Sequence, residues 1–332
     1  MAINVQVLPS GRQFISEGDS NLLEAGLRSG LALGYGCSNG NCGECLAKII
    51  SGEVKKIRHH DYRISEAENT SGHVLMCCNT AVTDVVLEAT EAQTSDEIPQ
   101  QQMTARVRSI STVNDDVALV HLKTPRTNRL RFLAGQHVRL GGNNMPAATH
   151  SVSSCPCDDM NLHFQIPRLC DDVFSDHIFN QLKKGDAVDI NGPGGDFVLN
   201  EDSPRVLVFI AWHTGFAPVR CLIEHAMALE LDQGIHLLWM TACKKDRYLD
   251  NLCRSWADAL DNFNYVPVDT GTANGEIDAG LIIKQLDIEP DDLSNCDFYI
   301  AGNSMLLDAS RKTLKNSGLP DGQLRIDPIE HG

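Results

Sequence analysis

Residues 37–45 read C-S-N-G-N-C-G-E-C, a C-x4-C-x2-C run formed by Cys37, Cys42 and Cys45, and Cys77 follows thirty-two residues later. This is the plant-type spacing for the thiolate ligands of a 2Fe-2S cluster. A loop this short can supply three ligands only if its backbone turns tightly, which the interleaved glycines permit. We therefore predict that these four cysteines bind a 2Fe-2S cluster and that the chain carries electrons one at a time.

Zinc binding and ordinary burial are the alternatives for cysteines in such a run. Zinc sites usually take paired C-x2-C ligands, whereas Cys77 is followed directly by Cys78. We expect Cys78 not to bind, because its side chain would point away from a cluster held by its neighbour. A second metal site at Cys155, Cys157 and Cys170 would have no evident fourth ligand.

The composition indicates a folded, multidomain protein with much negative charge. The chain has 332 residues, of which 42% are hydrophobic, and this is enough for two or three domains. A net charge of −16, spread along the chain, argues against a nucleic-acid partner. Such a surface would complement a basic patch on a redox partner, although solvated acidic side chains are the more ordinary reason for it.

The sequence gives no sign of a membrane segment or of export. No apolar run approaches the length of a spanning helix, and the N-terminal MAINVQVLPSG has neither the basic nor the apolar part of a signal peptide. The eight cysteines outside the cluster set form no disulfide framework, which fits a reducing compartment. We therefore expect a cytoplasmic protein that does not contact a membrane.

Three successive patterns predict a multidomain protein with α+β, β and α/β units. Residues 1–95 combine a strand hairpin, a helix with Ser20 as its N-cap, and the cysteine loop. Residues 96–202 repeat short strand-like runs, which predict a small antiparallel β-barrel. Residues 203–332 alternate apolar strands with helices and predict a parallel sheet covered on both faces. Ligands of such sheets bind at the carboxyl ends of the strands.

Several motifs carry a resemblance to one family over essentially the whole chain. Besides the cysteine loop they are LMCC at 75–78, LAGQ at 133–136, VFSDHIFNQL at 173–182, TGFAPV at 214–219 and YLDNLCRSW at 248–256. Together they resemble flavin reductases of the ferredoxin–NADP reductase family that have a fused N-terminal ferredoxin, such as the reductase components of bacterial monooxygenases.

The resemblance implies both an architecture and a function. It implies a β-grasp 2Fe-2S domain at 1–95, an FAD-binding-type barrel at 96–202 and an NAD(P)-binding-type domain with a parallel sheet at 203–332. In the family, NAD(P)H gives a hydride to FAD, and electrons then pass singly through the cluster to a partner. That partner would be a protein, an oxygenase or dehydrase component.

The first flavin segment departs from the family pattern. The family has R-x-Y-S-x-x-S, whereas residues 148–154 read A-T-H-S-V-S-S, so the arginine that pairs with the FAD pyrophosphate is absent. A lost charge-assisted phosphate contact costs on the order of 1.5–3 kcal/mol. His150 can still stack on the flavin, and Ser151 and Ser154 match the serines of the family.

The second flavin segment departs as well. The glycine turn G-x-x-S/T of the family reads D-V-F-S at 172–175. Only Ser175 remains of its hydroxyl and glycine contacts, while Asp171 and Asp172 place two carboxylates where a diphosphate would lie. These carboxylates would repel FAD.

The nicotinamide segments keep only part of the family pattern. The glycine-rich G-G-T-G reads W-H-T-G at 212–215 and keeps Thr214 and Gly215, with a bulky indole in front of them. The later C-G-P/S reads A-G-N at 301–303, so Gly302 remains but the cysteine does not.

Two interpretations stay open from these departures. In the first, His150, Ser151, Ser154 and Ser175 still hold FAD, and the chain is an NAD(P)H-dependent reductase. In the second, the chain is a flavin-free ferredoxin-type carrier or subunit whose degenerate reductase domains dock a partner, with Trp212 and the aspartates filling the cofactor sites.

Overall fold

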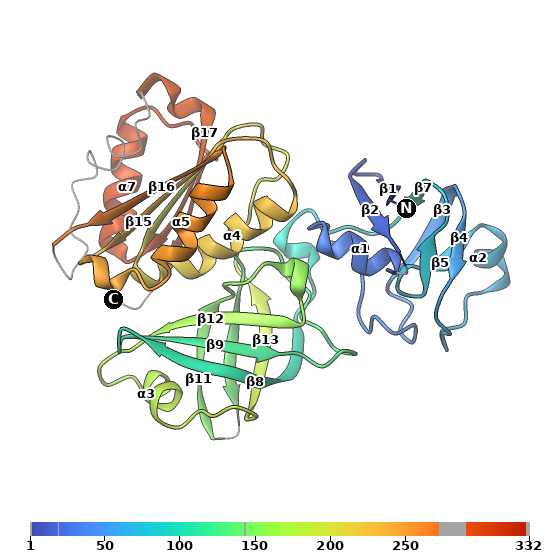
Figure 1. Cartoon of the computed structure of the whole chain (residues 1–332), viewed down its shortest axis with the longest axis horizontal. Coiled ribbons are helices and arrows are strands. Elements are labelled where there is room, and N and C mark those ends of the chain that lie inside the picture. Colours follow the sequence, from blue (N-terminus) through green and yellow to red (C-terminus); the bar gives the residue numbers. More distant parts are fainter. Residues whose placement is uncertain (1, 19, 143, 272–289, 330–332) are drawn as a thin grey trace.

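The chain folds into three successive units that Figure 1 shows in order of colour. The computed structural model describes residues 2–18, 20–142, 144–271 and 290–329. The N-terminal unit lies to one side, while the second and third units lie against each other. One buried apolar cluster runs without a break from the second unit into the third. The multidomain class predicted from the sequence is confirmed.

The N-terminal unit is a five-stranded mixed sheet crossed by a helix. Its strands lie in the order β2-β1-β7-β3-β5, and β1 pairs in parallel with β7 and antiparallel with β2. A separate small pair joins β4 to β6. The bounds are Ala2–Leu8 (β1), Gln13–Glu17 (β2), Leu22–Arg28 (α1), Leu46–Ser51 (β3), Val54–Lys56 (β4), Glu66–Thr70 (α2), His73–Leu75 (β5), Asn79–Ala81 (β6) and Val85–Glu88 (β7).

Helix α1 packs five of its seven residues into this unit and leads into the cysteine loop. Its N-cap is Asn21, whose side-chain oxygen accepts the N–H of Glu24 at 2.9 Å, so the predicted cap at Ser20 is wrong by one residue. The chain leaves the helix at Gly30, which adopts a φ of 83° that favours glycine.

The second unit is a six-stranded antiparallel sheet that curls into the predicted small barrel (Figure 1). The strand order is β11-β10-β13-β8-β9-β12, and helix α3 packs beside β11. The bounds are Gln101–Val113 (β8), Val117–Lys123 (β9), His137–Gly142 (β10), Met145–Ser151 (β11), Asn161–Pro167 (β12), Val173–Asn180 (α3) and Ala187–Gly194 (β13).

The third unit is a five-stranded parallel sheet with the order β16-β15-β14-β17-β18. Its central strand β14 packs Leu207 and Phe209 toward the barrel, whereas Val208 and Ile210 enter a second core on the face that α7 covers. The bounds are Val206–Trp212 (β14), Phe216–Ala228 (α4), Ile235–Thr241 (β15), Asp250–Ala259 (α5), Phe263–Asp269 (β16), Cys296–Gly302 (β17), Ser304–Asn316 (α7) and Leu324–Pro328 (β18).

A chain of ion pairs joins the N-terminal unit to the barrel. Arg129 contacts Glu24 of α1 at 2.5 Å and Asp159 at 3.2 Å, and the hydroxyl of Tyr35 also donates to Asp159. Burial raises the pKa of Asp159 to about 6, although Arg129 and Tyr35 oppose the shift. Because a buried charge that loses its partner is costly, these contacts hold the N-terminal unit in one position against the barrel.

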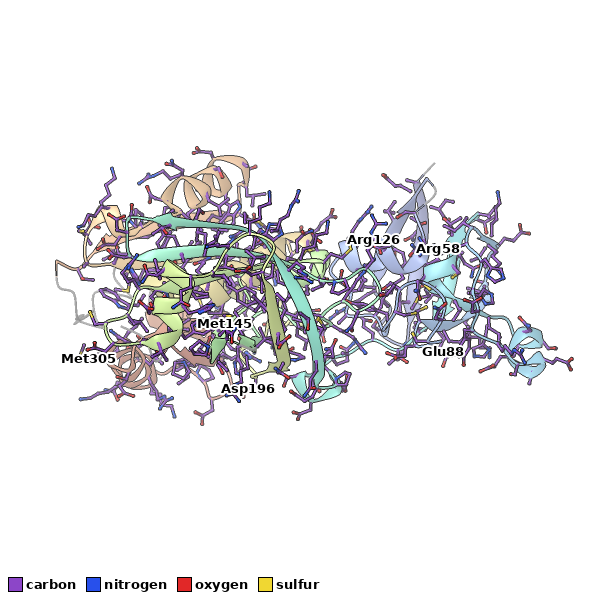
Figure 2. All side chains as sticks on the ribbon, turned by 90° about the horizontal axis from the view of Figure 1, so that it is seen from below. Arg58, Glu88, Arg126, Met145, Asp196 and Met305 are labelled. Carbon is purple, nitrogen blue, oxygen red and sulfur yellow. A yellow bond between two sulfur atoms is a disulfide. The ribbon has the colours of Figure 1, made fainter. Side chains whose placement is uncertain are left out.

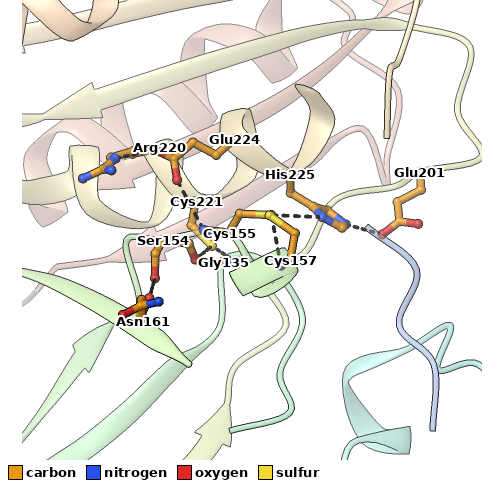
Figure 3. The surroundings of a disulfide bond; sticks show 10 residues. All are labelled: Gly135, Ser154, Cys155, Cys157, Asn161, Glu201, Arg220, Cys221, Glu224 and His225. Carbon is orange, nitrogen blue, oxygen red and sulfur yellow. Dashed lines mark hydrogen bonds and ion pairs between the residues drawn. A yellow bond between two sulfur atoms is a disulfide. The ribbon is translucent and has the colours of Figure 1, made fainter. Parts of the chain in front are cut away.

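A second ion-paired chain joins all three units. Arg12 of the first unit contacts Glu91 at 3.1 Å and also pairs with Glu201, which accepts from His225 of α4 at 2.8 Å. Figure 3 shows the Glu201–His225 part of this chain. We propose domain boundaries at 95/96 and 202/203, because the first sheet ends at Glu88 and the third begins at Val206.

Candidate functional site

The four cysteines of the predicted cluster site lie together as two pairs. The backbone N–H of Cys37 donates to the sulfur of Cys42 at 3.3 Å, and the N–H of Cys42 donates to the sulfur of Cys37 at 3.3 Å. The sulfurs of Cys45 and Cys77 are 3.2 Å apart. Cys45 and Cys77 are buried, whereas Cys42 is exposed, so one end of the site faces solvent.

Backbone N–H groups of the loop point at these sulfurs. Besides the mutual contacts, Asn41 donates to the Cys37 sulfur at 3.3 Å and Glu44 to the Cys42 sulfur at 3.5 Å. Burial alone would raise the pKa of Cys37, but the surrounding N–H donors lower it to about 7. Gly40 and Gly43 make the turn possible with φ values of 88°. These N–H donors therefore favour the thiolate of Cys37.

This arrangement fits a 2Fe-2S cluster better than a single ion. Among the described residues, no group of three or more His, Cys, Asp or Glu side chains converges on one metal position. Two pairs of thiolates suit two tetrahedral irons, and N–H donors to the sulfurs are one of the means by which proteins set a cluster potential. The buried Cys78 sulfur lies 3.6 Å from that of Cys77 and belongs to neither pair.

A cavity of about 270 Å³ lies between the barrel and the carboxyl ends of the parallel strands. Strand β11 contributes His150 and Ser151 to its wall, and the third unit contributes Thr214 and residues 326–329. The other wall residues are His137, Thr149, Gln165, Pro167, Gly195, Asp196, Phe197 and Ala217. Ligands of open α/β sheets bind at this edge.

Three of the predicted site residues come together in this cavity. The ring of His150 stacks on Phe174 of α3, with centroids 4.8 Å apart. The Ser151 hydroxyl donates to Asp327 at 3.1 Å. The Thr214 hydroxyl is buried and has no hydrogen-bond partner among the described residues. An unpartnered buried hydroxyl in a cavity wall is a fitting contact for a polar group of a ligand.

Asp327 is a site residue that the sequence predictions did not include. Its carboxylate lies opposite β11, and burial raises its pKa to about 6, while the Ser151 hydroxyl opposes the shift. The 325–329 segment that holds it reads R-I-D-P-I and lies outside the motifs on which the sequence analysis relied. The structure brings that segment back across the cavity as the last strand of the sheet.

The two glycines of the nicotinamide segments lie where the backbone crosses closely. A Cβ atom on Gly215 would come within 2.2 Å of the carbonyl oxygen of Ala301, and one on Gly302 within 2.7 Å of the Cβ of Trp212. The Trp212 side chain packs into the core on the α7 face rather than into the cavity. The expectation that Trp212 fills the cofactor site is therefore wrong, because strand alternation turns its side chain toward α7.

A second hollow, of about 740 Å³, lies at the start of α3. Asp171, Asp172 and Asp176 all line it, together with Ser175. Asp172 is the N-cap of α3 and accepts the N–H of Ser175 at 2.5 Å. The Ser175 hydroxyl accepts from the N–H of Leu169 and donates to the carbonyl of Pro167. The N–H and the hydroxyl of Ser175 are therefore already used by the protein.

The residues present fit the ring half of a flavin and not its diphosphate half. The 270 Å³ cavity offers an aromatic wall and an unpartnered hydroxyl. The α3 hollow offers three carboxylates, and its one arginine, Arg168, has its guanidinium over the ring of Phe179 at 4.0 Å. A diphosphate would meet repulsion there unless cations compensated it.

Ser154 lies outside both hollows. Its hydroxyl donates to the carbonyl of Asn161 at 3.0 Å and accepts the N–H of His163 at 3.1 Å, so it ties the loop after β11 to β12. Cys155 and Cys157 are joined in a disulfide (Figure 3), and this contradicts the alternative of a metal site shared with Cys170.

Comparisons with known proteins agree with these features. The chain matches family models for a 2Fe-2S iron-sulfur cluster binding domain at residues 5–83, an oxidoreductase FAD-binding domain at 104–199 and an oxidoreductase NAD-binding domain at 209–312. It is 31% identical to the CDP-6-deoxy-L-threo-D-glycero-4-hexulose-3-dehydrase reductase of Yersinia pseudotuberculosis, over 98% of both chains.

Two further similar proteins are named as reductases, one of a dioxygenase and one of a cytochrome P450. The chain is 26% identical to reductase component 1 of terephthalate 1,2-dioxygenase from Comamonas, over 90% of this chain and 89% of the relative. The structure of the Amycolatopsis cytochrome P450 reductase GcoB superposes with a TM-score of 0.63 at 25% identity, over 98% of both chains.

Fold, site and comparisons together define an electron-transfer reductase that uses NAD(P)H, FAD and a 2Fe-2S cluster. The chain belongs to the family of 2Fe-2S flavin reductases that includes the CDP-6-deoxyhexulose dehydrase reductase of Yersinia. The predicted resemblance and the predicted set of cofactor domains are confirmed. None of the described helices has both the length and the apolar character needed to cross a membrane.

Proposed function

We propose that NAD(P)H delivers electrons at the 270 Å³ cavity and that they leave through a cluster held by Cys37, Cys42, Cys45 and Cys77. The observation that carries this proposal is the pairing of the four cysteines in a loop whose N–H groups point at sulfur. Cys37 and Cys42 would bind one iron, and Cys45 and Cys77 the other.

A bound flavin would supply the step from two electrons to one, since it accepts a hydride and releases electrons singly. The residues of the cavity would serve that exchange. Ser151 and His150 would contact the flavin ring from β11, and Thr214 would offer its free hydroxyl to the ring or to the nicotinamide. Gly215 and Gly302 let the turn after β14 pack closely against the end of β17, next to the part of the sheet where the dinucleotide would bind.

The junction between the units supports a route from the cavity to the cluster. Tyr35 lies two residues before Cys37 and bonds Asp159 of the barrel unit. Burial lowers the pKa of Arg131, also at this junction, while the charges of Tyr35 and Glu44 oppose the shift. The side of the cysteine loop that begins at Tyr35 therefore faces the barrel, and the exposed Cys42 end faces outward.

The proposed acceptor is a protein, an oxygenase or a dehydrase component, because the relatives are reductase components of such systems. We also propose that the protein works in the cytoplasm, where reducing conditions keep thiols available to a cluster. Ten of the twelve cysteines are free, and the Cys155–Cys157 disulfide is the departure from the sequence-based expectation of free thiols.

Anaerobic stopped-flow mixing of the cluster-loaded protein with FAD and then NADH or NADPH tests this function. We expect the visible absorption of the cluster to bleach within the time of turnover. The Cys42→Ser protein is the control for the cluster signal. A protein that binds no flavin and whose cluster is not bleached by either nucleotide would instead be the flavin-free carrier.

A further inference from the structure

The cluster's exposed end is bordered by a basic segment in an otherwise acidic protein. Residues 54–63 read V-K-K-I-R-H-H-D-Y-R, with four lysines and arginines and one carboxylate, whereas the chain as a whole carries −16. The side chains of Lys55, Lys56, Arg58 and Arg63 are exposed. Figure 2 places Arg58 on the outer, N-terminal unit.

This segment is packed directly on the cysteine loop. An Nη1 donor of Arg58 contacts the carbonyl of Ser38 at 3.0 Å, and the N–H of Tyr62 donates to the carbonyl of Gly40 at 3.0 Å. The ring of Tyr62 lies so close to Gly43 that a Cβ there would be 2.2 Å away. The cations on this segment therefore lie beside the end of the site at which Cys42 is exposed.

The charges on the segment are not neutralised within the protein. Among the ion pairs of the described residues, none involves Lys55, Lys56, Arg58 or Arg63. The carboxylate of Asp61 pairs with His59 at 3.7 Å. Ile57 is 38% exposed between these cations and adds an apolar contact at the centre of the segment.

We propose that residues 54–63 form the docking surface for the electron acceptor, and that the acceptor presents an acidic patch around its own redox centre. This inference rests on the proposed function, in which the cluster is the exit. It gives the partner an acidic patch, whereas the net charge of −16 taken alone would complement a basic one. A local field of this kind governs which surface of a partner meets the cluster first, and it can raise association rates by 10–10³-fold.

The proposal can be tested with two haem proteins of opposite surface charge. The cluster-loaded protein is reduced with dithionite, which bypasses NAD(P)H and flavin, and is mixed in a stopped-flow instrument with cytochrome b5, which has an acidic haem edge. Cytochrome c, which has a basic haem edge, is the paired probe. We expect faster oxidation by cytochrome b5 at low salt, with a rate that falls about tenfold as salt is raised.

Charge reversal in Lys55→Glu/Lys56→Glu/Arg63→Glu should slow cytochrome b5 at least about tenfold and speed cytochrome c. The matched control is Arg108→Glu/Lys183→Glu/Lys184→Glu, which reverses the same residue types on the exposed barrel surface and should leave both rates within about twofold. Arg58 is left in place because it bonds the cluster loop. If the triple variant loses its cluster absorption, Lys55→Gln/Lys56→Gln replaces it.

Two results would overturn the proposal. One is a cytochrome b5 rate that rises with salt, which is what the net charge of −16 predicts without a local basic field. The other is a segment variant whose rates match those of the barrel variant. Neither result would bear on whether NAD(P)H reduces the cluster, because dithionite supplies the electrons here.

Discussion

The cysteine loop and the cavity beside the barrel differ in how their polar groups are used. In the loop, the N–H groups of Asn41, Cys42 and Glu44 point at cysteine sulfurs that would bind the cluster. Around the cavity and the α3 hollow, two carboxylates already accept hydrogen bonds from the protein. Asp172 caps α3, and Asp327 accepts from Ser151.

The two redox sites of this chain therefore differ in how many of their polar groups already point toward the place of the cofactor. In the loop, a bound cluster would replace the contact between the Cys45 and Cys77 sulfurs, and the backbone N–H donors could stay in place. A bound flavin would have to displace or accommodate the carboxylates of Asp172 and Asp327, which already accept hydrogen bonds from Ser175 and Ser151. The predictions below test this contrast, and the largest expected effect comes first.

Replacing Cys42 by serine should abolish the cluster. The alkoxide of serine is a poor substitute for a thiolate, and Cys78 lies beside Cys77 and belongs to neither cysteine pair. We expect loss of the visible absorption bands and of the electron paramagnetic resonance signal after reduction. Cys78→Ser is the control and should keep both signals, and a Cys42→Ser protein with full cluster absorption would refute the pairing.

Replacing Asp327 by asparagine should stabilise the C-terminal unit at neutral pH. Burial raises the pKa of Asp327 from 3.8 to about 6, so the folded protein holds a proton that the unfolded chain has lost. Stability therefore falls as the pH rises from about 4 to 6, and the loss persists above pH 6. Asp327→Asn removes this loss and should add about 2–3 kcal/mol at pH 7.5 and almost nothing at pH 4.

Urea unfolding followed by tryptophan fluorescence measures this effect. All three tryptophans, at positions 212, 239 and 256, belong to the C-terminal unit and report on it directly. Asp196→Asn, which changes an exposed carboxylate on the same cavity wall, should shift the midpoint much less. Equal gains at pH 4 and pH 7.5 would show that Asp327 does not titrate as its burial requires.

The sequence was most informative where ligands and structure are local. The cluster cysteines fall within one loop and one nearby 3-10 turn, Met76–Cys78, so their spacing alone predicted both the site and its cofactor. The three sheets were also predictable, because the periodicity of apolar residues changes from alternating strands to buried parallel strands near residue 203. The N-cap of α1 was missed by one residue because Ser20 and Asn21 are both good caps.

The cavity was only partly predictable because it is assembled from three distant segments. Its walls come from β11, the turn after β14 and the last strand, β18. Family motifs located His150, Ser151 and Thr214 there, but nothing in the sequence shows that Asp327 would reach Ser151 across 176 residues. The direction of the Trp212 side chain depended on which face of β14 meets the barrel, which is decided by tertiary packing.

Flavin affinity offers a test of the missing diphosphate contacts. Ala148 lies between Pro146, which lines the α3 hollow, and His150, which lines the cavity, and strand alternation puts all three on one face of β11. An arginine at 148 would therefore stand between the two hollows. We expect the native chain to bind FAD and riboflavin with affinities within about tenfold of each other, because the diphosphate adds little.

The double variant Ala148→Arg/Asp172→Asn should tighten FAD binding by about 10–100-fold and leave riboflavin unchanged. Asparagine keeps the N-cap of α3 and removes only its charge. Quenching of flavin fluorescence on titration gives both affinities, and Ala148→Gln serves as a control of similar length without charge. Native FAD binding far tighter than riboflavin binding would show that Arg168 or another group already compensates the carboxylates.

The smallest expected effect concerns the buried cavity hydroxyl of Thr214, which has no hydrogen-bond partner among the described residues. Thr214→Val replaces a buried, unpartnered hydroxyl by a methyl group of similar size. If the hydroxyl is held ready for a ligand, its removal should stabilise the ligand-free C-terminal unit by about 1 kcal/mol and raise the KM for NAD(P)H several-fold. Tryptophan-monitored urea unfolding and steady-state kinetics measure the two effects on one protein.

Thr241→Val is the control. The Thr241 hydroxyl is buried but donates to the carbonyl of Cys243 at 3.0 Å, so this change should destabilise the unit. Destabilisation of both variants would mean that the Thr214 hydroxyl has a structural partner. The hydroxyl would then be engaged within the protein, as Ser175 is at the start of α3.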